Sequence, residues 1–120
     1  MEIWKETSYI DDIVDGIIKT IIKKPHKNKN HISLSSAPYQ IYNIGNNKPI
    51  SLIKFINTIE DACSLKAKIN FLPMQPGDVP ETYADIDSFV SHTEFTPSTT
   101  IEDGIKSFVD WYRECAIKNP

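Results

Sequence analysis

Three carboxylates near the N-terminus, Asp11, Asp12 and Asp15, are the first residues in this sequence whose types and spacing could do chemistry. On a helix, Asp11 and Asp15 share a face while Asp12 points elsewhere. Metal binding or acid–base catalysis is one interpretation of this cluster. Helix capping and solvation are the better explanation, because acidic side chains near a helix N-terminus interact favourably with the helix dipole.

Histidines and cysteines form no recognisable metal or nucleophile motif. His26 and His31 stand in a polar segment without an accompanying cysteine or carboxylate cluster, so the sequence does not favour a zinc site. Cys63 and Cys115 are too few for a disulfide scaffold or a cysteine-only zinc site. Neither cysteine has a histidine nearby in the sequence, although the fold could still bring one close.

The glycines are too widely separated to build a phosphate-binding turn. The 120 residues contain no G-x-G-x-x-G, no P-loop and no G-x-S-x-G nucleophile elbow. The common glycine-rich nucleotide sites and the serine-hydrolase site are therefore excluded within this sequence. The four glycines are Gly16, Gly45, Gly77 and Gly104.

Composition indicates one small globular domain over residues 1–120. The chain has a mass of 13.7 kDa, 40% apolar residues and a net charge of -3, which fits one modest core and gives no nucleic-acid or membrane-surface signature. No apolar run approaches the ~20 residues of a membrane span. The N-terminus lacks the apolar stretch of a signal peptide. We therefore expect a reduced, cytoplasmic, α/β or α-rich domain.

The first half of the chain predicts a helix, a loop and a strand. Isoleucine spacing predicts a helix over residues 9–24, capped by Asp11 or Asp12 and stopped by Pro25. Residues 25–38 predict a basic, solvated loop, for which anion binding is the alternative. Residues 39–44 predict a short strand that ends at a Gly-Asn-Asn turn.

The second half predicts a βαβ unit followed by two helices. Ser51 is expected to cap a second helix, and residues 68–72 are expected to form a parallel strand. The loop at 73–80 would then follow the carboxyl end of a strand, where ligands of open α/β sheets bind. Asp85 is expected to cap a short helix, and Thr99 or Thr100 offers two registers of a capping box for the last helix. The residues expected to face inward from that helix are Ile101, Ile105, Phe108, Val109, Tyr112, Cys115 and Ala116.

Four segments in order make the sequence similar to a known family. The chain, from about Lys5 to Cys115, resembles the C-terminal part of an NAD-dependent nucleotide-sugar epimerase of the UDP-glucuronate 4-epimerase type, within the extended short-chain dehydrogenase/reductase superfamily. Such enzymes occur in capsule and lipopolysaccharide biosynthesis. The resemblance implies a small α/β substrate-binding portion, mainly helices with two or three short strands, without the Rossmann portion. The segments are SYIDDIVDGI, APYQIYNIGNN, NFLPMQPGDVPETYADID and FVDWYREC.

The resemblance also implies what these residues lack. Family members oxidise the sugar at C4 with NAD held on an N-terminal Rossmann portion, return the hydride to the opposite face, and use a Tyr-x-x-x-Lys pair. No tyrosine here has a lysine four positions on. We therefore expect a truncated epimerase that is inactive alone and holds no cofactor in this chain. Met1, just upstream of the matching region, suggests a gene remnant or a deliberately chosen boundary.

By the resemblance, the substrate-binding residues are Lys5, Gln75, Asp78 and Thr82. Lys5 stands where related epimerases have a diphosphate-binding Arg, and it keeps the charge without the bidentate fork. Gln75 would donate to a phosphate or sugar oxygen, Asp78 would accept from ribose hydroxyls, and Thr82 would lie near the sugar. The structural alternative is that residues 76–78 form only a turn.

Partner expectations follow from the missing Rossmann portion. Apolar surface on the first helix, or the strand edge at 39–44, should be exposed and predicts a homodimer or a bound partner. A UDP-sugar should bind weakly, at millimolar concentration or above. The alternatives to a remnant are one half of a split epimerase, a protein-interaction module, and an anion binder using the lysines between residues 23 and 29.

Overall fold

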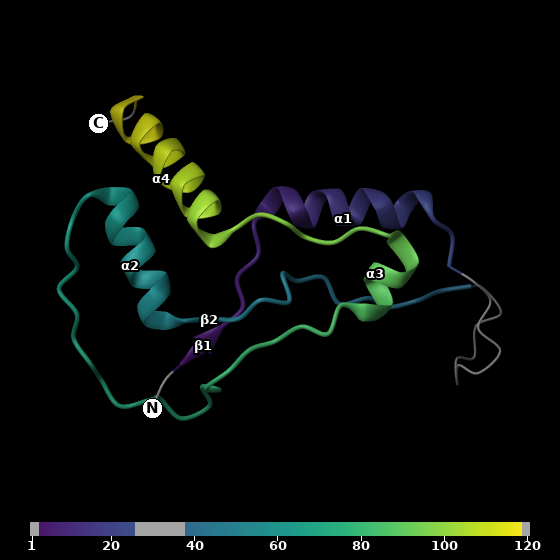
Figure 1. Ribbon diagram of the computed structural model, residues 1–120, viewed down its shortest axis with the longest axis horizontal. Coiled ribbons are helices and arrows are strands. Elements are labelled where there is room, and N and C mark those ends of the chain that lie inside the picture. The colour runs from purple at the N-terminus through teal and green to yellow at the C-terminus, as the bar shows by residue number, and fades with distance from the viewer. Residues whose placement is uncertain (1–2, 26–37, 119–120) are drawn as a thin grey trace.

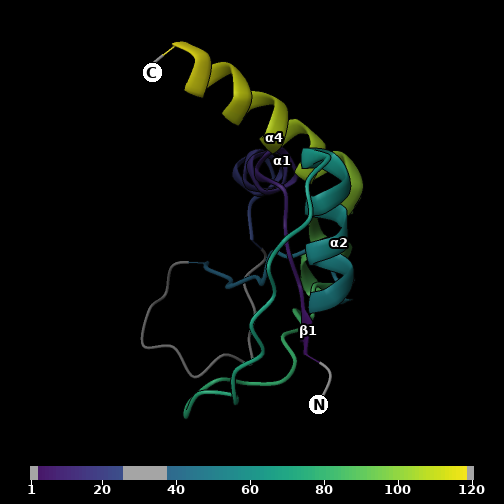
Figure 2. The ribbon, with the colours of Figure 1, turned by 90° about the vertical axis from the view of Figure 1, so that its left-hand side faces the viewer.

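The computed structural model describes residues 3–25 and 38–118, and long extended connections join its helices (Figure 1). A family-like portion of mainly helices with two short strands is confirmed. Figures 1 and 2 show α2 beside the first turns of α4, and α3 beneath one end of α1. The elements are β1 (Trp4–Lys5), α1 (Ile10–Ile22), β2 (Ile50–Ser51), α2 (Leu52–Cys63), α3 (Asp87–Thr93) and α4 (Ile101–Lys118).

The helix α1 forms as predicted, but its cap differs. Tyr9 holds the N-cap position without a side-chain hydrogen bond, and Asp11 and Asp12 lie in the first turn, so the predicted aspartate cap is wrong. The buried Asp12 carboxylate instead accepts from the backbone N–H groups of Ser98 and Thr99, at 3.3 and 2.9 Å. Asp12 therefore holds the segment that leads into α4 against the start of α1. It does not cap its own helix, because these long-range partners occupy its carboxylate.

Local capping signals place the other helices. The Ser51 hydroxyl accepts from the Lys54 N–H at 3.3 Å, which confirms the predicted cap of α2. Thr100 accepts from the Asp103 N–H at 3.1 Å, so the Thr100 register of the predicted cap is the one that forms. The Asp103 carboxylate accepts from the Thr100 hydroxyl at 2.6 Å rather than from the Thr100 N–H, so only the threonine half of the capping box is made. The predicted N-cap of α3 is wrong by one residue, because Ile86 holds that position without a side-chain hydrogen bond. Asp85, directly before it, accepts from the Asp87 N–H at 3.1 Å.

The predicted strands at 39–44 and 68–72, and with them the βαβ unit, are wrong. Neither segment is a strand in the structure. The sheet instead pairs β1 with β2 in antiparallel order, with Trp4 opposite Ser51 and Lys5 opposite Ile50. A parallel bridge joins Trp4 to Glu81.

The buried core is small and lies mostly around one ring. Phe89 on α3 is completely buried, and Ile86, Pro97, Ile105 and Val109 are also buried. A Cβ built at Gly16 of α1 would lie 2.9 Å from the Phe89 ring, so glycine permits the close approach of α1 and α3. Of the α4 residues expected to face inward, Phe108, Tyr112 and Ala116 are exposed, since α2 covers only part of that face.

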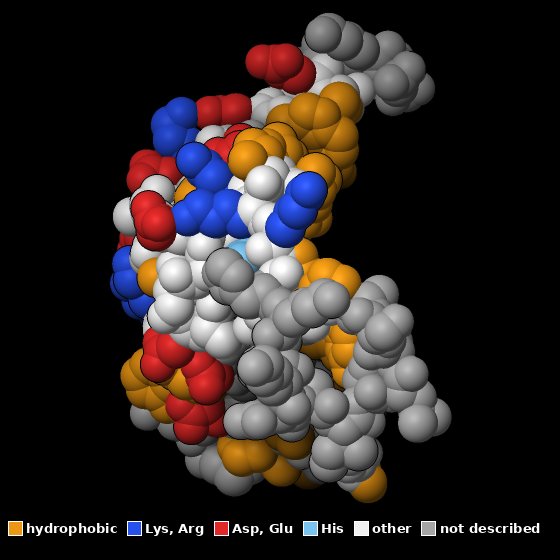
Figure 3. Space-filling model, turned by 90° about the vertical axis from the view of Figure 1, so that its right-hand side faces the viewer, with side chains coloured by type: hydrophobic (Ala, Val, Ile, Leu, Met, Phe, Trp, Pro, Cys, Tyr) orange, Lys and Arg blue, Asp and Glu red, His pale blue; other side chains and the backbone are white. Residues whose placement is uncertain are grey.

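Much apolar surface stays exposed outside this core. The chain has a radius of gyration of 18.7 Å, against about 14 Å for a compact domain of this length. Figure 3 shows hydrophobic side chains on the surface at the border of one face. Within residues 3–25 and 38–118, no helix is long and apolar enough to cross a membrane. The exposed isoleucines of α1 are Ile10, Ile17, Ile18, Ile21 and Ile22.

Candidate functional site

The strand β1 brings the N-terminal segment and the loop at 73–82 together. On one side it pairs with β2, and the Leu52 N–H donates to the Ile3 carbonyl at 2.8 Å. On the other side, the Trp4 N–H donates to the Pro80 carbonyl at 2.8 Å, and the Thr82 N–H donates to the Trp4 carbonyl at 3.2 Å. These backbone bonds place the predicted site residues at one edge of β1.

Lys5 reaches the loop that was predicted to cover a nucleotide. Its Nζ donates to the Val79 carbonyl at 2.8 Å, next to Asp78. The Asp78 N–H donates to the Gln75 carbonyl at 3.2 Å, which closes a turn with Gly77 at φ 95°. Lys5 is half-buried, whereas Gln75 and Asp78 are exposed. A cation, an amide and a carboxylate thus border one surface loop, an arrangement suited to phosphate and hydroxyl groups.

Thr82 makes a structural contact in addition to the sugar contact predicted for it. Its hydroxyl accepts from the Glu6 N–H at 3.1 Å, and its side chain is half-buried. This bond fastens the loop to the segment after β1. Thr82 therefore holds the site together in this structure, and a contact with sugar stays a prediction.

Sequence reasoning missed Glu6, which braces the same region. Its carboxylate accepts from the Ala84 N–H. A Cβ at Gly45 would overlap Glu6 Oε1 and lie 2.8 Å from the Ala84 Cβ, so only glycine leaves space for this contact. The sequence offers one signal for this role, which is that Glu6 directly follows Lys5. Neighbouring residues in extended chain point to opposite sides, so Glu6 should face the side of the segment that Lys5 does not.

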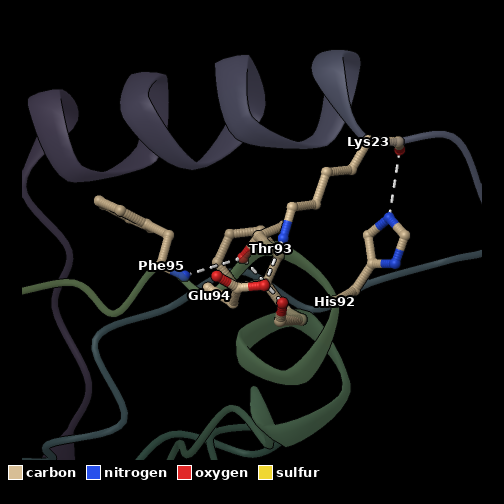
Figure 4. A network of polar contacts seen from close by, with 6 residues as sticks. Lys23, His92, Thr93, Glu94 and Phe95 are labelled. Atoms are coloured by element: carbon tan, nitrogen blue, oxygen red, sulfur yellow. Dashed lines mark hydrogen bonds and ion pairs between the residues drawn. The ribbon is translucent and has the colours of Figure 1, made fainter.

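A second polar network fastens α3 to the end of α1 (Figure 4). Lys23 Nζ lies 2.8 Å from Glu94 Oε1, and this ion pair lowers the pKa of Glu94. His92 Nε2 lies 3.1 Å from the Lys23 carbonyl, and the His92 ring stacks on Tyr42 at 5.2 Å. Burial raises the pKa of Tyr42. These contacts join elements of the fold, and they bind Lys23 to a carboxylate rather than leaving it for an external anion.

The remaining candidate residues do not gather. The structure separates the aspartates, with Asp12 buried and Asp11 and Asp15 exposed. No group of three or more metal-ligating side chains occurs in the part of the chain that the structure describes. His26 and His31 lie outside the described residues, as do the lysines of the predicted basic loop at 27 and 29.

A separate cavity of about 820 Å³ lies between α2 and α4. Apolar side chains dominate its lining, with Arg113 and a few hydroxyl groups among them. Arg113 Nη2 donates to the Ala62 and Cys63 carbonyls, at 3.2 and 2.9 Å, at the end of α2. Its lining also includes Thr7 and Ser8, so the cavity begins close to Lys5.

Comparisons with known proteins find relatives that match nearly the whole chain. No family model matches it. It is 43% identical to Protein CapI of Staphylococcus aureus, covering 92% of this chain and 35% of that protein, and 35% identical to a probable UDP-glucuronate 4-epimerase of Rhizobium meliloti, covering 90% and 34%. The chain thus spans about a third of the length of these relatives.

The fold comparison agrees. A UDP-glucuronic acid 4-epimerase of Bacillus cereus, solved with UDP-glucuronic acid and NAD, superposes with a TM-score of 0.70 at 25% identity, covering 90% of this chain and 31% of that one. Sequence and fold therefore match the same limited portion of much longer proteins.

Proposed function

We propose that this chain, which corresponds to the C-terminal portion of an NAD-dependent nucleotide-sugar epimerase of the UDP-glucuronate 4-epimerase type, forms one wall of a UDP-sugar site. The wall is the edge of β1 with Lys5, Gln75, Asp78 and Thr82. By itself the chain binds a UDP-sugar weakly and does not epimerise it. In its cell it would serve polysaccharide biosynthesis in the cytoplasm.

The contact between Lys5 Nζ and the Val79 carbonyl carries this proposal. It holds a cation beside the exposed turn of residues 75–78, although 74 positions separate the two partners. An ammonium group has three donors, so one bond to a carbonyl leaves capacity for a phosphate oxygen. The Asp78 carboxylate is a natural acceptor for ribose hydroxyls, and the Gln75 amide can donate to either group.

Weak affinity follows from the exposure of the same loop. Gln75 and Asp78 are exposed, and tight small-molecule sites bury most of the ligand surface. Epimerisation also needs a hydride carrier and an acid–base group at the sugar. The 120 residues contain neither a glycine-rich dinucleotide turn nor a Tyr-x-x-x-Lys pair. A second wall, outside these 120 residues, would therefore have to supply NAD and the reacting groups.

An amide NMR titration with UDP and UDP-glucuronate tests the binding wall. We expect shifts confined to Lys5 and residues 75–82, growing in proportion to ligand up to millimolar concentrations. Lys5→Gln should abolish them, while Lys106→Gln, which removes an exposed lysine on α4, should leave them unchanged. Well-dispersed spectra that ignore both ligands, or shifts that both variants reduce equally, would refute the wall.

Adding an NAD-binding polypeptide tests the second, split-enzyme form of this proposal. The exposed isoleucines of α1 favour that form, because an unsealed apolar helix face suits a packed neighbour. Co-expression with the N-terminal two-thirds of a relative should restore NAD-dependent interconversion of UDP-glucuronate and its C4 epimer. Absence of turnover from a purified one-to-one complex would remove the split form and leave the binding result standing.

A further inference from the structure

We propose that Glu6 is the positioning residue of the UDP-sugar wall, and that it holds the loop of residues 75–82 in place against Lys5. This inference rests on the proposed function, because it explains how the wall keeps its shape. Glu6 needs no contact with the ligand for this role. It acts through the loop, together with the hydroxyl of Thr82.

The backbone bonds beside β1 begin a parallel ladder. The Trp4 N–H donates to the Pro80 carbonyl at 2.8 Å, and the Thr82 N–H donates to the Trp4 carbonyl at 3.2 Å. In a regular parallel ladder such slanted bonds are evenly spaced along the strands. The next two bonds would therefore run from the Glu6 N–H to the Thr82 carbonyl and from the Ala84 N–H to the Glu6 carbonyl.

Side chains take the place of both carbonyls at this next step. The Glu6 N–H donates to the Thr82 hydroxyl at 3.1 Å, and the Ala84 N–H donates to the Glu6 carboxylate. A side-chain oxygen reaches farther from the backbone than a carbonyl does, so the two segments can stand farther apart than the ~4.8 Å of a direct ladder. Glu6 and Thr82 therefore set the separation of the two segments where the loop meets β1.

The loop depends on this end because the connection before it is not fastened. Figure 1 shows that connection as a long extended segment after α2. Residues 64–81 are all exposed, and Thr82 is the first half-buried residue after them. Among the residues that the structure describes, those from 68 to 74 make no hydrogen bond. The bonds at residues 79–84 therefore decide where the turn at 75–78 lies relative to Lys5.

Gly45 confines the Glu6 carboxylate to its position. Gly45 is buried, and a Cβ built on it would overlap Glu6 Oε1 and lie 2.8 Å from the Ala84 Cβ. Gly45 does not have a positive φ, so glycine is needed there for space rather than for backbone conformation. The carboxylate is thereby held between the backbone at Gly45 and the Ala84 N–H that it accepts from.

The reach of the Glu6 side chain matters more than its charge. An amide oxygen accepts from an N–H as a carboxylate oxygen does, so Glu6→Gln should keep the bond to Ala84. A negative charge near Lys5 opposes an anionic ligand, so Glu6→Gln should bind a UDP-sugar at least as tightly. Glu6→Asp keeps the charge but is one methylene shorter, and it should fail to reach Ala84.

Amide NMR without ligand tests whether Glu6 holds the loop. Glu6→Ala should expose the Ala84 N–H to hydrogen exchange and shift the amide resonances of residues 75–79. Glu6→Gln should restore both, and Glu6→Asp should not. Because Glu6→Asp retains a charged carboxylate of nearly the same size, it reads the loop position even if Glu6→Ala does not fold.

A second glutamate in the chain provides the matched control. Glu60 accepts from the Ala67 N–H at 2.8 Å, at the other end of the same connection. Glu60→Ala should therefore shift amides near Ala67 and leave those of residues 75–79 unchanged, because the segment between has no hydrogen bonds to transmit the change. Gly45→Ala displaces the Glu6 carboxylate sterically and should reproduce the shifts of Glu6→Ala.

Titration of the same variants with UDP-glucuronate tests the consequence for binding. Glu6→Ala should raise the dissociation constant about fivefold, the usual effect of losing one hydrogen bond. Glu60→Ala should leave that constant unchanged. A loop that moves in Glu6→Ala without any loss of affinity would overturn the proposal.

Three results without ligand would also overturn it. They are unchanged resonances at 75–79 in both Glu6→Ala and Glu6→Asp, equal changes there in Glu60→Ala, and restoration by Glu6→Asp but not by Glu6→Gln, which would assign the role to charge. An unsubstituted chain that ignores UDP-glucuronate refutes the binding wall instead. The ligand-free spectra then still decide whether Glu6 holds the loop, so the two proposals fail separately.

Discussion

Two phenylalanines on neighbouring parts of this chain have opposite surroundings. Phe89 of α3 is 0% exposed, enclosed by α1, Tyr42 and Phe95. Phe108 of α4 is 59% exposed at the edge of an open cavity. In the first region, the buried Thr93 hydroxyl also donates to the Phe89 carbonyl at 2.8 Å.

The difference shows which part of the chain is complete without a partner. Around Phe89, helices, ring contacts and hydrogen bonds close on one another, so folding there depends on the chain's own residues. Between α2 and α4, only Ile105 and Val109 are buried, and α2 has no buried residue. The two helices α2 and α4 are held mainly by their caps and by one shared face of contact. Packing of a further surface against them would therefore add the most stability there.

Truncating each phenylalanine tests the difference between the two regions with the largest expected effect. Phe89→Ala should lower the free energy of unfolding by about 3–5 kcal/mol, because it leaves a cavity in the only fully enclosed ring site among the described residues. Phe108→Ala should cost the monomer only about 1 kcal/mol, since most of that ring is already hydrated. Urea unfolding at low protein concentration measures both. Equal losses would contradict the division into closed and open regions.

Adding a methyl group at two glycines gives an effect of intermediate size. Gly16→Ala should destabilise by about 1–3 kcal/mol, because the new Cβ would lie 2.9 Å from the immovable Phe89 ring. At Gly104 on α4, the nearest atom is Tyr9 Cδ2 at 3.1 Å, on a half-buried ring beside the cavity. There the better helix propensity of alanine should win, and Gly104→Ala should stabilise by up to about 1 kcal/mol. Thermal unfolding measures both, and we expect the melting temperature to fall for Gly16→Ala and to rise for Gly104→Ala.

The parts of this fold that the sequence predicts are the local ones. Isoleucine spacing locates α1, and the hydroxyls of Ser51 and Thr100 locate the starts of α2 and α4, because each signal acts within one helical turn. The prediction of strands at 39–44 and 68–72 is wrong because a strand depends on a distant partner. The alternation of side chains within one segment cannot reveal whether such a partner is present.

The candidate site divides in the same way. The turn at 75–78 follows from its Pro-Gly-Asp sequence, whereas the contact of Lys5 with Val79 spans 74 residues and is invisible to local patterns. The family resemblance supplied Lys5, and it supplied no hint of Glu6 and Gly45. The cavity between α2 and α4 was likewise unpredictable, because it depends on how two helices separated by 37 residues (64–100) meet beside residues 7–10.

Removing the caps of the two helices that border the cavity should cost less than changing the core. Thr100→Ala should lower stability by about 1 kcal/mol, and Ser51→Ala by somewhat less. Thr100 makes two reciprocal bonds with Asp103, at 2.6 and 3.1 Å, whereas Ser51 accepts one at 3.3 Å. Circular dichroism during urea unfolding measures both, and substitution by serine at Thr100 should restore most of the loss.

The smallest expected effect concerns one carboxylate in each region. Glu60 of α2 has its pKa lowered by the hydrogen bond from Lys66, by the Ala67 N–H and by the charge of Lys66. Glu94 beside α3 has its pKa lowered by Lys23. Glu60 is largely covered and ties the chain after α2 back to the helix, while Glu94 is mostly exposed.

The sign of the pH dependence follows from these lowered pKa values. A carboxylate with a lower pKa in the folded chain contributes stability above its unfolded pKa, and it loses that contribution as the pH falls through the folded value. Glu60→Gln should therefore destabilise at neutral pH, and its difference from the unsubstituted chain should vanish in acid. Glu94→Gln should follow the same course with a smaller amplitude, because exposed ion pairs contribute little. Melting temperatures of both variants across the acid range measure the two amplitudes, and a larger amplitude for Glu94 would show that the network around α3 depends on its surface charges.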